Sequence, residues 1–359
     1  ADGPCRLCKR TGAAVTEAIF AIPGDHKQRT GGYIYEASVL SALNEIGCQT
    51  ELLPLPASFP DPTQADMAYT IAALAAVSDQ HTIILDGFLV GSLDPRRLDE
   101  VRAPKIGIVH HPLGHETGLA PERARFLQAN EKAVLAHLRH VIVPSPHTAQ
   151  VLVDDFAVGP DRISIALPGF LRPKVAPCPA TPPVILSVGL LAPRKGHDVL
   201  LDALGKLKNL DWRAEIVGKA HDIDYSARLH DQCRALGLIN RICFTGELEP
   251  PALQTRFAAA SVFALATRYE GYGMVLSEAM LHHLPVVSCK VGAVPDTVGK
   301  AGLLVECDNA AAFADALRDV LTNNNLRRDL ADKAPERAKA LPHWQDTAEI
   351  FARIVYSLR

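Results

Sequence analysis

The chain has 359 residues, of which 48% are hydrophobic and 21% are charged, and this length and composition predict a globular protein with two domains of ordinary size. Its 37 basic and 40 acidic side chains give a formal net charge of −3, and no long run of Lys or Arg supplies a local basic patch. Nucleic acid is therefore not expected as a partner.

The cysteines and the first residues indicate the compartment. Cys243 and Cys289 lie in apolar, strand-like runs, where a thiol usually behaves as a small buried hydrophobe, as expected in a reducing compartment. Cys5 and Cys8 form a CxxC without a second pair, which gives little support for zinc. Residues 1–16 read as a ragged leader, without the pattern of a signal peptide or a membrane span. We expect a cytoplasmic protein, with peripheral contact at the inner face of the membrane left open.

Residues 17–170 alternate between apolar runs of strand length and patterns of helical spacing. Strands are expected at 17–23, 49–55, 81–88, 105–111, 141–145 and 162–169. Helices are expected at 33–47, within 64–77, at 121–138 and from residue 146 onward. Because these strands are apolar on both faces, the pattern predicts a parallel sheet that is covered by helices on each side.

Residues 171–183 contain five prolines and no periodicity, so they read as a linker, and the alternation restarts after them. Strands are expected at 184–189, 213–218, 241–246, 261–266, 285–290 and 301–306. Helices are expected at 196–208, 223–236, 250–259, after Gly273, and at 310–322, 325–339 and 344–357.

The predicted fold class is therefore α/β, with two doubly wound parallel-sheet domains at 17–170 and 184–342. The last helix, within 343–359, is expected to cross back to the first domain. In open parallel sheets a ligand binds beyond the carboxyl ends of the strands. Two such domains face to face would hold it between them.

The stretch YEGYGMVLSE combines a glycine turn, a helix start and two carboxylates. Gly271 and Gly273 let the backbone approach a ligand closely, and the helix start that follows attracts phosphate. Glu270 and Glu278 are acceptors suited to sugar hydroxyls. Together they indicate a sugar joined to a diphosphate. The alternative is a common turn in which Glu270 favours the helix dipole and Glu278 is solvated.

The loop after the strand at 184–189 carries the adjacent cations Arg194 and Lys195, just before Gly196 and a helix start. Two cations beside a helix N-terminus can neutralise a diphosphate without a metal, and Arg can do so through two hydrogen bonds. They could instead be solvated loop charges. Their place after the first strand of a domain favours the phosphate role.

Four segments, VGLLAPRKGHDVLLDAL, YEGYGMVLSEAM, LPVVSCKVGAVPDTVG and AGLLVE, resemble the retaining glycosyltransferases of family 4, which have the GT-B fold. The resemblance covers nearly the whole chain. Its strongest motif is the Glu-x7-Glu of Glu270 and Glu278, followed by RKG at 194–196 and TGG at 30–32. It implies transfer of a sugar from a nucleoside-diphosphate sugar to an acceptor hydroxyl, with retention and without a metal or other cofactor.

The resemblance also implies roles for individual residues. Glu270 would hold hydroxyls of the donor sugar, Glu278 the ribose hydroxyls, and Arg194 and Lys195 the leaving phosphates. The remaining donor-binding positions would act mainly through the backbone: Gly31 and Gly32 in the first domain, Glu247 and Leu248 near the base, and Gly271, Tyr272, Gly273, Met274 and Val275 along the sugar and diphosphate. One departure is Leu190, where many members carry Arg.

The first domain would supply the group that faces the acceptor. His110, rather than His111, best matches the family histidine at the end of its strand; the alternative is a histidine that is satisfied by a local carbonyl. Glu116, on the loop that follows, could border the acceptor. The acceptor itself, whether a glycan, a lipid-linked molecule or a small molecule, is not specified.

The sequence also bears on functions other than transfer. A nicotinamide dehydrogenase would need G-x-G-x-x-G after a domain's first strand, which is absent. No zinc-binding helix or paired Asp-x-Asp stands in a suggestive place, so no metal is expected. A nucleotide-sugar epimerase or phosphorylase of the same fold, and a non-catalytic two-lobed binding protein, remain alternatives.

Overall fold

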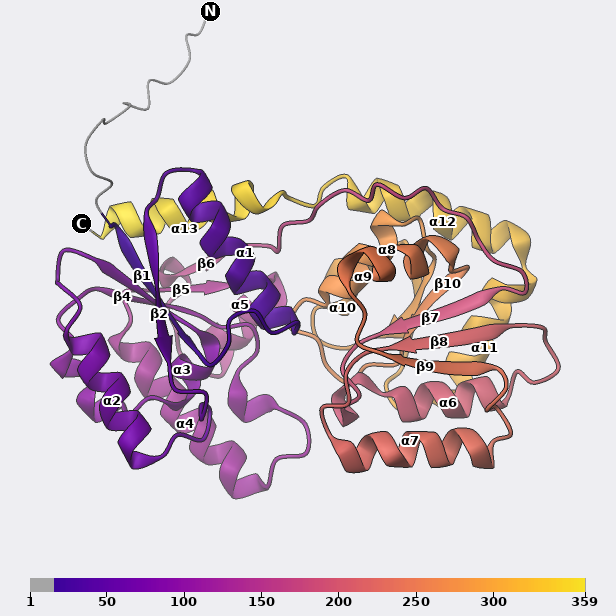
Figure 1. Ribbon diagram of the computed structural model, residues 1–359, viewed down its shortest axis with the longest axis horizontal. Helices are drawn as coiled ribbons and strands as arrows, with labels where there is room; N and C mark the ends of the chain where they lie inside the picture. The colour runs from indigo at the N-terminus through magenta and orange to yellow at the C-terminus, as the bar shows by residue number, and fades with distance from the viewer. Residues whose placement is uncertain (1–15, 359) are drawn as a thin grey trace, which may run out of the picture.

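The computed structural model describes residues 16–358, so Cys5, Cys8 and nearly all of the predicted leader lie outside the described residues. The chain forms two six-stranded parallel sheets, one in each half (Figure 1). The strand orders are β2-β1-β3-β4-β5-β6 and β12-β11-β10-β7-β8-β9. The expected α/β class with two doubly wound domains is confirmed.

In the first half the chain alternates strands with crossover helices. The strands are β1 Ala18–Pro23, β2 Thr50–Leu55, β3 Thr82–Leu85, β4 Lys105–Ile108, β5 His140–Val143 and β6 Ile163–Ile165. The α-helices are α1 Gly31–Glu45, α2 Gln64–Ala75, α3 Gly87–Ser92, α4 Pro121–His137 and α5 Pro146–Asp154. The short 3-10 helices are η1 Pro95–Glu100, η2 Leu113–His115 and η3 Pro160–Arg162.

The second half repeats this alternation and ends in three helices. The strands are β7 Val184–Val188, β8 Arg213–Val217, β9 Ile242–Gly246, β10 Val262–Leu265, β11 Val286–Cys289 and β12 Gly302–Val305. The helices are η4 Pro193–Lys195, α6 His197–Gly205, α7 Ile223–Ala235, α8 Pro250–Ala259, α9 Met274–Leu281, α10 Val294–Val298, α11 Ala310–Thr322, α12 Asn324–Ala338 and α13 Trp344–Ser357.

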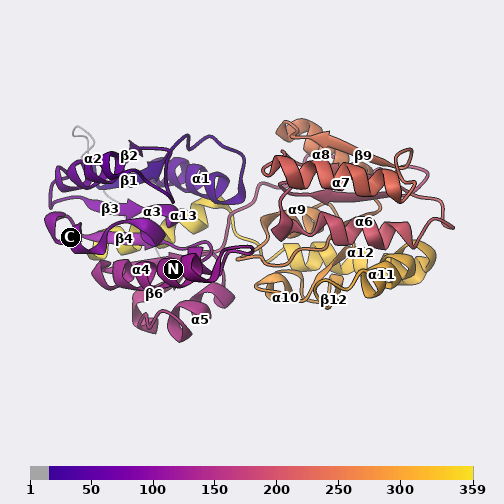
Figure 2. The same ribbon diagram turned by 90° about the horizontal axis from the view of Figure 1, so that it is seen from below.

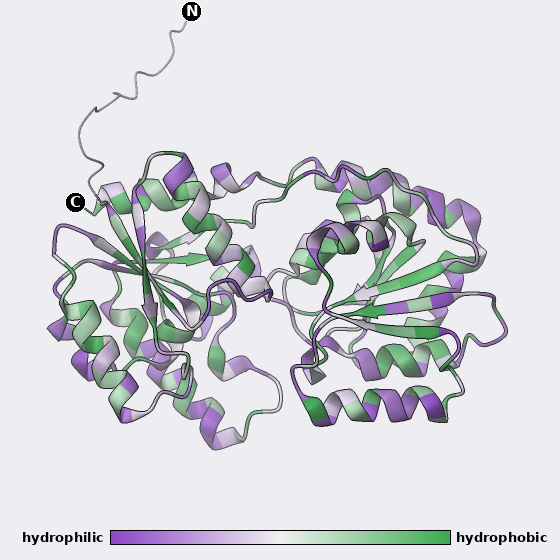
Figure 3. Cartoon of the chain, in the orientation of Figure 1, coloured by the Kyte–Doolittle hydropathy of each residue, from purple (hydrophilic) through white to green (hydrophobic). Residues whose placement is uncertain are grey.

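Each sheet is buried on both faces because successive strand residues point to opposite sides. On β3, Ile83 and Leu85 pack into the core beneath α2, α3 and α4, whereas Ile84 packs on the other face with α1 and α13. The second sheet divides its residues in the same way between two cores. Both sheets accordingly form apolar layers between helices whose outer faces are polar (Figures 2 and 3).

Helix α13 returns to the first domain, as predicted for the end of the chain. Its residues Phe351 and Val355 are buried in one core with Val39 and Leu43 of α1. Figure 1 shows α13 lying along the first domain after α12 has packed on the second. The amide of Phe170 donates to Pro342 O over 2.9 Å, so the two chain segments that pass between the domains lie side by side.

Some local expectations were wrong. The strands expected at 105–111 and 162–169 end at Ile108 and Ile165. The strand expected at 81–88 ends at Leu85, because the Asp86 side chain accepts the amide of Phe88 over 2.7 Å and so starts α3. Cys243 is exposed, since β9 is an edge strand of its sheet, whereas Cys289 is buried as expected. Among residues 16–358, no helix is both long and apolar enough to cross a membrane.

Candidate functional site

The loops that follow the strands of the two sheets meet at one junction, and a buried carboxylate lies there. Glu270 follows β10 and is 5% exposed. Its Oε1 lies 2.6 Å from Lys195 Nζ and accepts the Thr267 hydroxyl over 3.1 Å, and its Oε2 lies 3.7 Å from Arg194 Nη1. Burial acts to raise the pKa of Glu270, but the two cations outweigh it and hold the pKa below its usual range. Glu270 is therefore ionised at neutral pH.

Arg194 connects this cluster to the first domain. Its Nη1 donates to Tyr269 O over 3.0 Å, while its Nε lies 3.3 Å from Oε1 of Glu116, on the turn that follows β4. The structure thus places Arg194 and Lys195 together with Glu270, from segments 75 residues apart. It also places Glu116, for which the sequence offered no geometry, directly against Arg194.

Two glycines fit this junction because they lack a side chain. A Cβ on Gly271 would lie 2.0 Å from His110 O, so only glycine permits this contact between the two domains. Thr148 of the first domain donates to Gly271 O over 3.2 Å. Gly273 has φ +83 and precedes α9, whose first two amides, those of Met274 and Val275, have no acceptor within the helix and can face a ligand. The predicted glycine turn therefore lies where the domains touch.

The other residues of this stretch divide between the site and the core. The Tyr272 ring is buried against Phe170 and its hydroxyl lies 3.1 Å from Ser277 Oγ, so only the Tyr272 backbone is available to a ligand. Met274 and Val275 open α9, and Met274 packs against cores of both domains.

Glu278 lies one turn further along α9 and is half-buried. No hydrogen bond or ion pair involves its carboxyl group among the described residues. Burial raises the pKa of Glu278 to about 7. An unpartnered carboxyl group of this kind can accept hydrogen bonds from hydroxyl groups, and the ribose role of Glu278 stays a prediction.

The loop between β9 and α8 carries the predicted base-binding residues. Glu247 is exposed, and Leu248 packs partly against the core of its domain. The next residue, Glu249, forms a two-pronged ion pair with Arg29 of the β1–α1 loop, at 2.7 and 2.5 Å. This loop therefore contacts the first domain directly.

The first domain presents the start of α1 and the end of β4. Gly31 has open space around its Cα, and a Cβ on Gly32 would lie 3.4 Å from the His110 ring. His110 Nε2 lies 3.1 Å from Oε1 of Glu36, so the ring is held by a carboxyl group rather than by a local carbonyl. Its side chain is 24% exposed.

His111 contacts other neighbours than His110 does, as expected, although both residues lie beyond the end of β4. Its ring packs on Tyr269 with centroids 4.3 Å apart, and its Nε2 lies 3.7 Å from Oε2 of Glu116. Burial and the nearby Arg194 lower the pKa of His111 to about 3, so the ring is neutral. His111 thus lines the junction beside Arg194, a position that we did not predict.

Sequence reasoning also missed Glu36 and Asp86, which lie behind His110. Glu36 is the one acidic residue on the buried side of α1, and Asp86 stands at the carboxyl end of a fully buried strand. Both residues could have been found from the sequence, because an acidic residue among residues expected to be buried and apolar requires a hydrogen-bonding partner.

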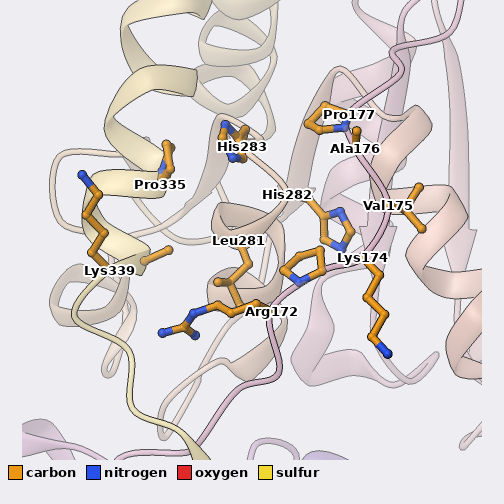
Figure 4. A pocket seen from close by; sticks show the side chains of 12 residues that line it. Arg172, Lys174, Val175, Ala176, Pro177, Leu281, His282, His283, Pro335 and Lys339 are labelled. Carbon is orange, nitrogen blue, oxygen red and sulfur yellow. The ribbon is translucent and has the colours of Figure 1, made fainter.

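Two cavities lie outside the cluster around Glu270. One, of about 560 Å³, lies between Thr117 and Gly118 of the first domain and Arg268 of the second. The other, of about 470 Å³, lies at the carboxyl end of α9 and contains none of the predicted site residues (Figure 4). Arg172 in its wall donates to Leu341 O, in the segment between α12 and α13, over 2.8 Å.

The cluster at the junction can bind a ligand with a diphosphate and a polyol part. Arg194, Lys195 and the free amides of α9 offer positive charge, while Glu270 and Glu278 offer acceptors. Leu190, in place of Arg, adds no cation. Among residues 16–358, no group of three or more His, Cys, Asp or Glu side chains could hold a metal ion.

Residues 172–337 match the sequence profile of the family described as Glycosyl transferases group 1. The D-inositol 3-phosphate glycosyltransferase of Corynebacterium urealyticum is 31% identical over 188 residues, which are 50% of this chain and 44% of that protein. The chain spans about half the length of the curated relatives it matches.

Two solved structures share the arrangement of both domains. Sucrose-phosphate synthase from Thermosynechococcus elongatus aligns with a TM-score of 0.80 at 21% identity, over 95% of this chain and 99% of that one. Anabaena HepE, solved with UDP and glucose, aligns with a TM-score of 0.74 at 18% identity, over 96% of this chain and 100% of the HepE chain. At these identities the likeness shows the fold alone. Residues 172–337 are therefore similar to the glycosyl transferases of group 1, and the two facing domains have the GT-B fold that these solved structures share.

Proposed function

We propose that the protein is a retaining glycosyltransferase that moves a sugar from a nucleoside-diphosphate sugar to an acceptor hydroxyl without a metal. The observation that carries the proposal is the buried cluster of Arg194, Lys195 and Glu270, which lies beneath a glycine turn where the two domains touch. HepE, which shares the fold, is solved with UDP and glucose. The curated relative in Corynebacterium urealyticum is a D-inositol 3-phosphate glycosyltransferase.

The proposed chemistry assigns each group a role. The bond between the sugar and the diphosphate breaks through an oxocarbenium-like state, and Arg194, Lys195 and the start of α9 stabilise the charge that develops on the diphosphate. Glu270 accepts hydroxyls of the donor sugar, and Glu278 accepts those of the ribose. The acceptor hydroxyl attacks from the face that the diphosphate leaves, which retains the anomeric configuration, and its proton passes to an oxygen of the departing diphosphate.

The setting of the reaction is also part of the proposal. The acceptor would bind on the first domain, near His110 and the turn that carries Glu116. The described cysteines are free thiols, and Cys48, Cys233 and Cys289 are buried, which fits a reducing compartment such as the cytoplasm. Peripheral contact with a membrane would bring a lipid-linked acceptor to the first domain.

A donor screen tests the proposal. The protein is incubated with UDP- and GDP-sugars, with and without candidate acceptors such as inositol phosphate, and nucleotide release is followed together with sugar identity. Transfer predicts acceptor-dependent nucleotide release. Isomerised sugar without an acceptor would support an epimerase, sugar phosphate formed with inorganic phosphate would support a phosphorylase, and binding without turnover would support a binding protein.

The finer parts of the proposal need separate measurements on the same reaction. Proton NMR of the product reports the anomeric configuration, and inversion would contradict the retaining mechanism. Turnover in excess EDTA that equals turnover in added Mg²⁺ supports metal independence, whereas loss of turnover in EDTA would contradict it.

A further inference from the structure

The His110 ring lies on two buried carboxyl groups that belong to other elements of the first domain. We propose that Glu36 and Asp86 share one proton and thereby position His110 with Nε2–H inward and Nδ1 as an unprotonated acceptor. This inference rests on the proposed function only for its catalytic consequence, because the arrangement itself exists without substrate. Glu36 and Asp86 are positioning residues, since they act through His110.

The first step is the contact between Glu36 and His110. Glu36 lies on α1, is 0% exposed, and its Oε1 is 3.1 Å from His110 Nε2. The edge of the Tyr35 ring packs against the same imidazole, with centroids 5.0 Å apart. A buried carboxylate is stabilised by an N–H donor. The Nε2 of His110 therefore carries the hydrogen.

The second step concerns the other oxygen of Glu36. Oε2 is buried and makes no regular hydrogen bond among the described residues, while the carboxyl group of Asp86 and the amide of Gly87 lie close enough to the Glu36 carboxyl group to act on its pKa. Oδ1 of Asp86 is occupied, because it accepts the amides of Phe88 and Leu89 at 2.7 and 3.4 Å. Two carboxyl groups can form a hydrogen bond only through a proton, so the pair holds one.

The third step decides which group is ionised. Burial raises the pKa of Glu36 to about 7, and Asp86 and the Gly87 amide oppose that rise. Burial and the neighbouring Glu36 raise the pKa of Asp86 well above its usual value, so Asp86 holds the proton. The phenols of Tyr33 and Tyr35, the other ionisable groups facing the pair, stay neutral because burial raises their pKa. Burial lowers the pKa of His110 to about 4, so the imidazole is neutral.

The consequence is a fixed tautomer at the domain junction. With Nε2–H donated to Glu36, the other ring nitrogen, Nδ1, accepts a hydrogen bond. Its partner would be a sugar hydroxyl between the domains, since His110 follows β4 and its backbone touches Gly271. A free histidine distributes its proton between both nitrogens, so removal of Glu36 would lose this orientation.

The tautomer can be measured without any substrate by NMR of the full chain labelled with ¹⁵N-histidine. The His110 signals are assigned among the 14 histidines by difference from a His110→Asn variant. We expect a protonated Nε2 and an unprotonated Nδ1 in the wild type. A wild-type spectrum with the proton on Nδ1 would overturn the inference.

Two variants separate positioning from general damage. In Asp86→Asn the amide group donates to Glu36 as the protonated acid does and still caps α3, so the tautomer is expected to stay as in the wild type. In Glu36→Leu the acceptor is lost, and the ring is expected to show both tautomers. Tyr35→Phe is the matched control, because Tyr35 lies beside Glu36 in α1. The change removes the hydrogen bond from the Tyr35 hydroxyl to Ala166 O but no hydrogen bond of a His110 nitrogen.

Kinetics then test the consequence. Glu36→Leu is expected to lower kcat about tenfold or more, as for loss of one orienting hydrogen bond, while UDP or GDP binds as in the wild type. Asp86→Asn is expected to keep kcat within about threefold, since the fixed tautomer is retained. A changed tautomer in Asp86→Asn would overturn the inference, and so would a wild-type tautomer in Glu36→Leu. The measurement on Asp86→Asn decides the inference even if the Glu36→Leu variant does not fold. If no nucleotide sugar turns over, the proposed function fails, while the spectra still decide the positioning.

Discussion

At the scale of single residues, each charged side chain at the domain junction depends on its neighbours of opposite charge. Glu270 is buried between Lys195 and Arg194, and Arg194 is also held by Glu116. The side chains of Glu270 and Lys195 are both largely buried, so removing one leaves the other without its partner.

Replacement of Lys195 therefore affects both activity and stability. We expect Lys195→Ala to lower kcat about 10²- to 10³-fold, because one fixed donor to the leaving diphosphate is lost. Its free energy of unfolding should also fall by about 3–5 kcal/mol, because Glu270 is left buried and unpaired. Steady-state kinetics and urea unfolding measure the two effects. The exposed Lys206 provides the control, since Lys206→Ala should change neither. Wild-type turnover in Lys195→Ala would remove Lys195 from the site.

The carboxyl group of Glu278 should make the affinity for the donor depend on pH. Because burial raises the pKa of Glu278 to about 7, its carboxylate form, the better hydroxyl acceptor, increases between about pH 6 and pH 8. Wild-type affinity for the donor should rise over this range, whereas affinity of Glu278→Ala should be about tenfold weaker and nearly flat. Calorimetric titration at both pH values tests this. A fall in kcat larger than the loss of affinity would contradict a ribose role.

At the scale of elements, helix α4 holds the turn that reaches the second domain. Oε2 of Glu131 accepts the amide of Leu113, the first residue of η2, over 3.0 Å. Gly114 lies so close to α4 that a Cβ would be 2.8 Å from Ala124 O. Glu116 follows this turn and meets Arg194. A buried carboxyl group thus anchors the segment that links the domains.

The anchor makes stability depend on pH. Burial raises the pKa of Glu131 to about 8, from an ordinary value of 4.5, so the folded state keeps this proton where the unfolded state has lost it. The wild type should therefore lose stability relative to Glu131→Gln as pH rises from about 4.5 to 8, by at most about 1.4 kcal/mol per pH unit. Urea unfolding of both proteins at pH 5, 6.5 and 8 measures the difference. A difference that is constant with pH would contradict a buried, neutral Glu131.

At the scale of the whole molecule, the two domains touch through a few defined contacts. Gly271 lies against His110 O, Arg29 pairs with Glu249, and Met274 packs on cores of both domains. Helix α13 joins the end of the chain to the first domain. Since the Arg29–Glu249 pair is exposed, it adds little stability, and the close packing at Gly271 fixes the approach of the domains.

Adding one methyl group at this contact should separate the domains. A Cβ in Gly271→Ala would lie 2.0 Å from His110 O, so the junction would have to open. We expect turnover to fall about 100-fold, because a displacement of about 1 Å in a positioned site has that effect. Small-angle X-ray scattering should show a larger radius of gyration with little change in unfolding. Gly205→Ala is the control, since its Cβ would meet only the movable end of Leu236. Unchanged scattering and turnover would contradict this account of the contact.

The sequence by itself determined the fold and the composition of the junction. Strands apolar on both faces can be buried only in a parallel sheet between helices, which is why the alternation predicted two doubly wound domains correctly. The motifs RKG and Glu-x7-Glu stand directly after strands, and parallel strands bring such loops to one edge. Local pattern therefore sufficed to predict that these motifs lie near one another, while their roles remain predictions.

Only the tertiary structure decided which charges are paired across the fold. Glu36 meets His110 from 74 residues away, and Glu116 meets Arg194 across the two domains. Such contacts depend on how α1 packs over its sheet and how the domains approach, and neither leaves a periodic trace in the sequence. For the same reason the burial of Glu270 and Lys195, and the turning of the Tyr272 ring into the core, could not be read from residues that look like an exposed loop.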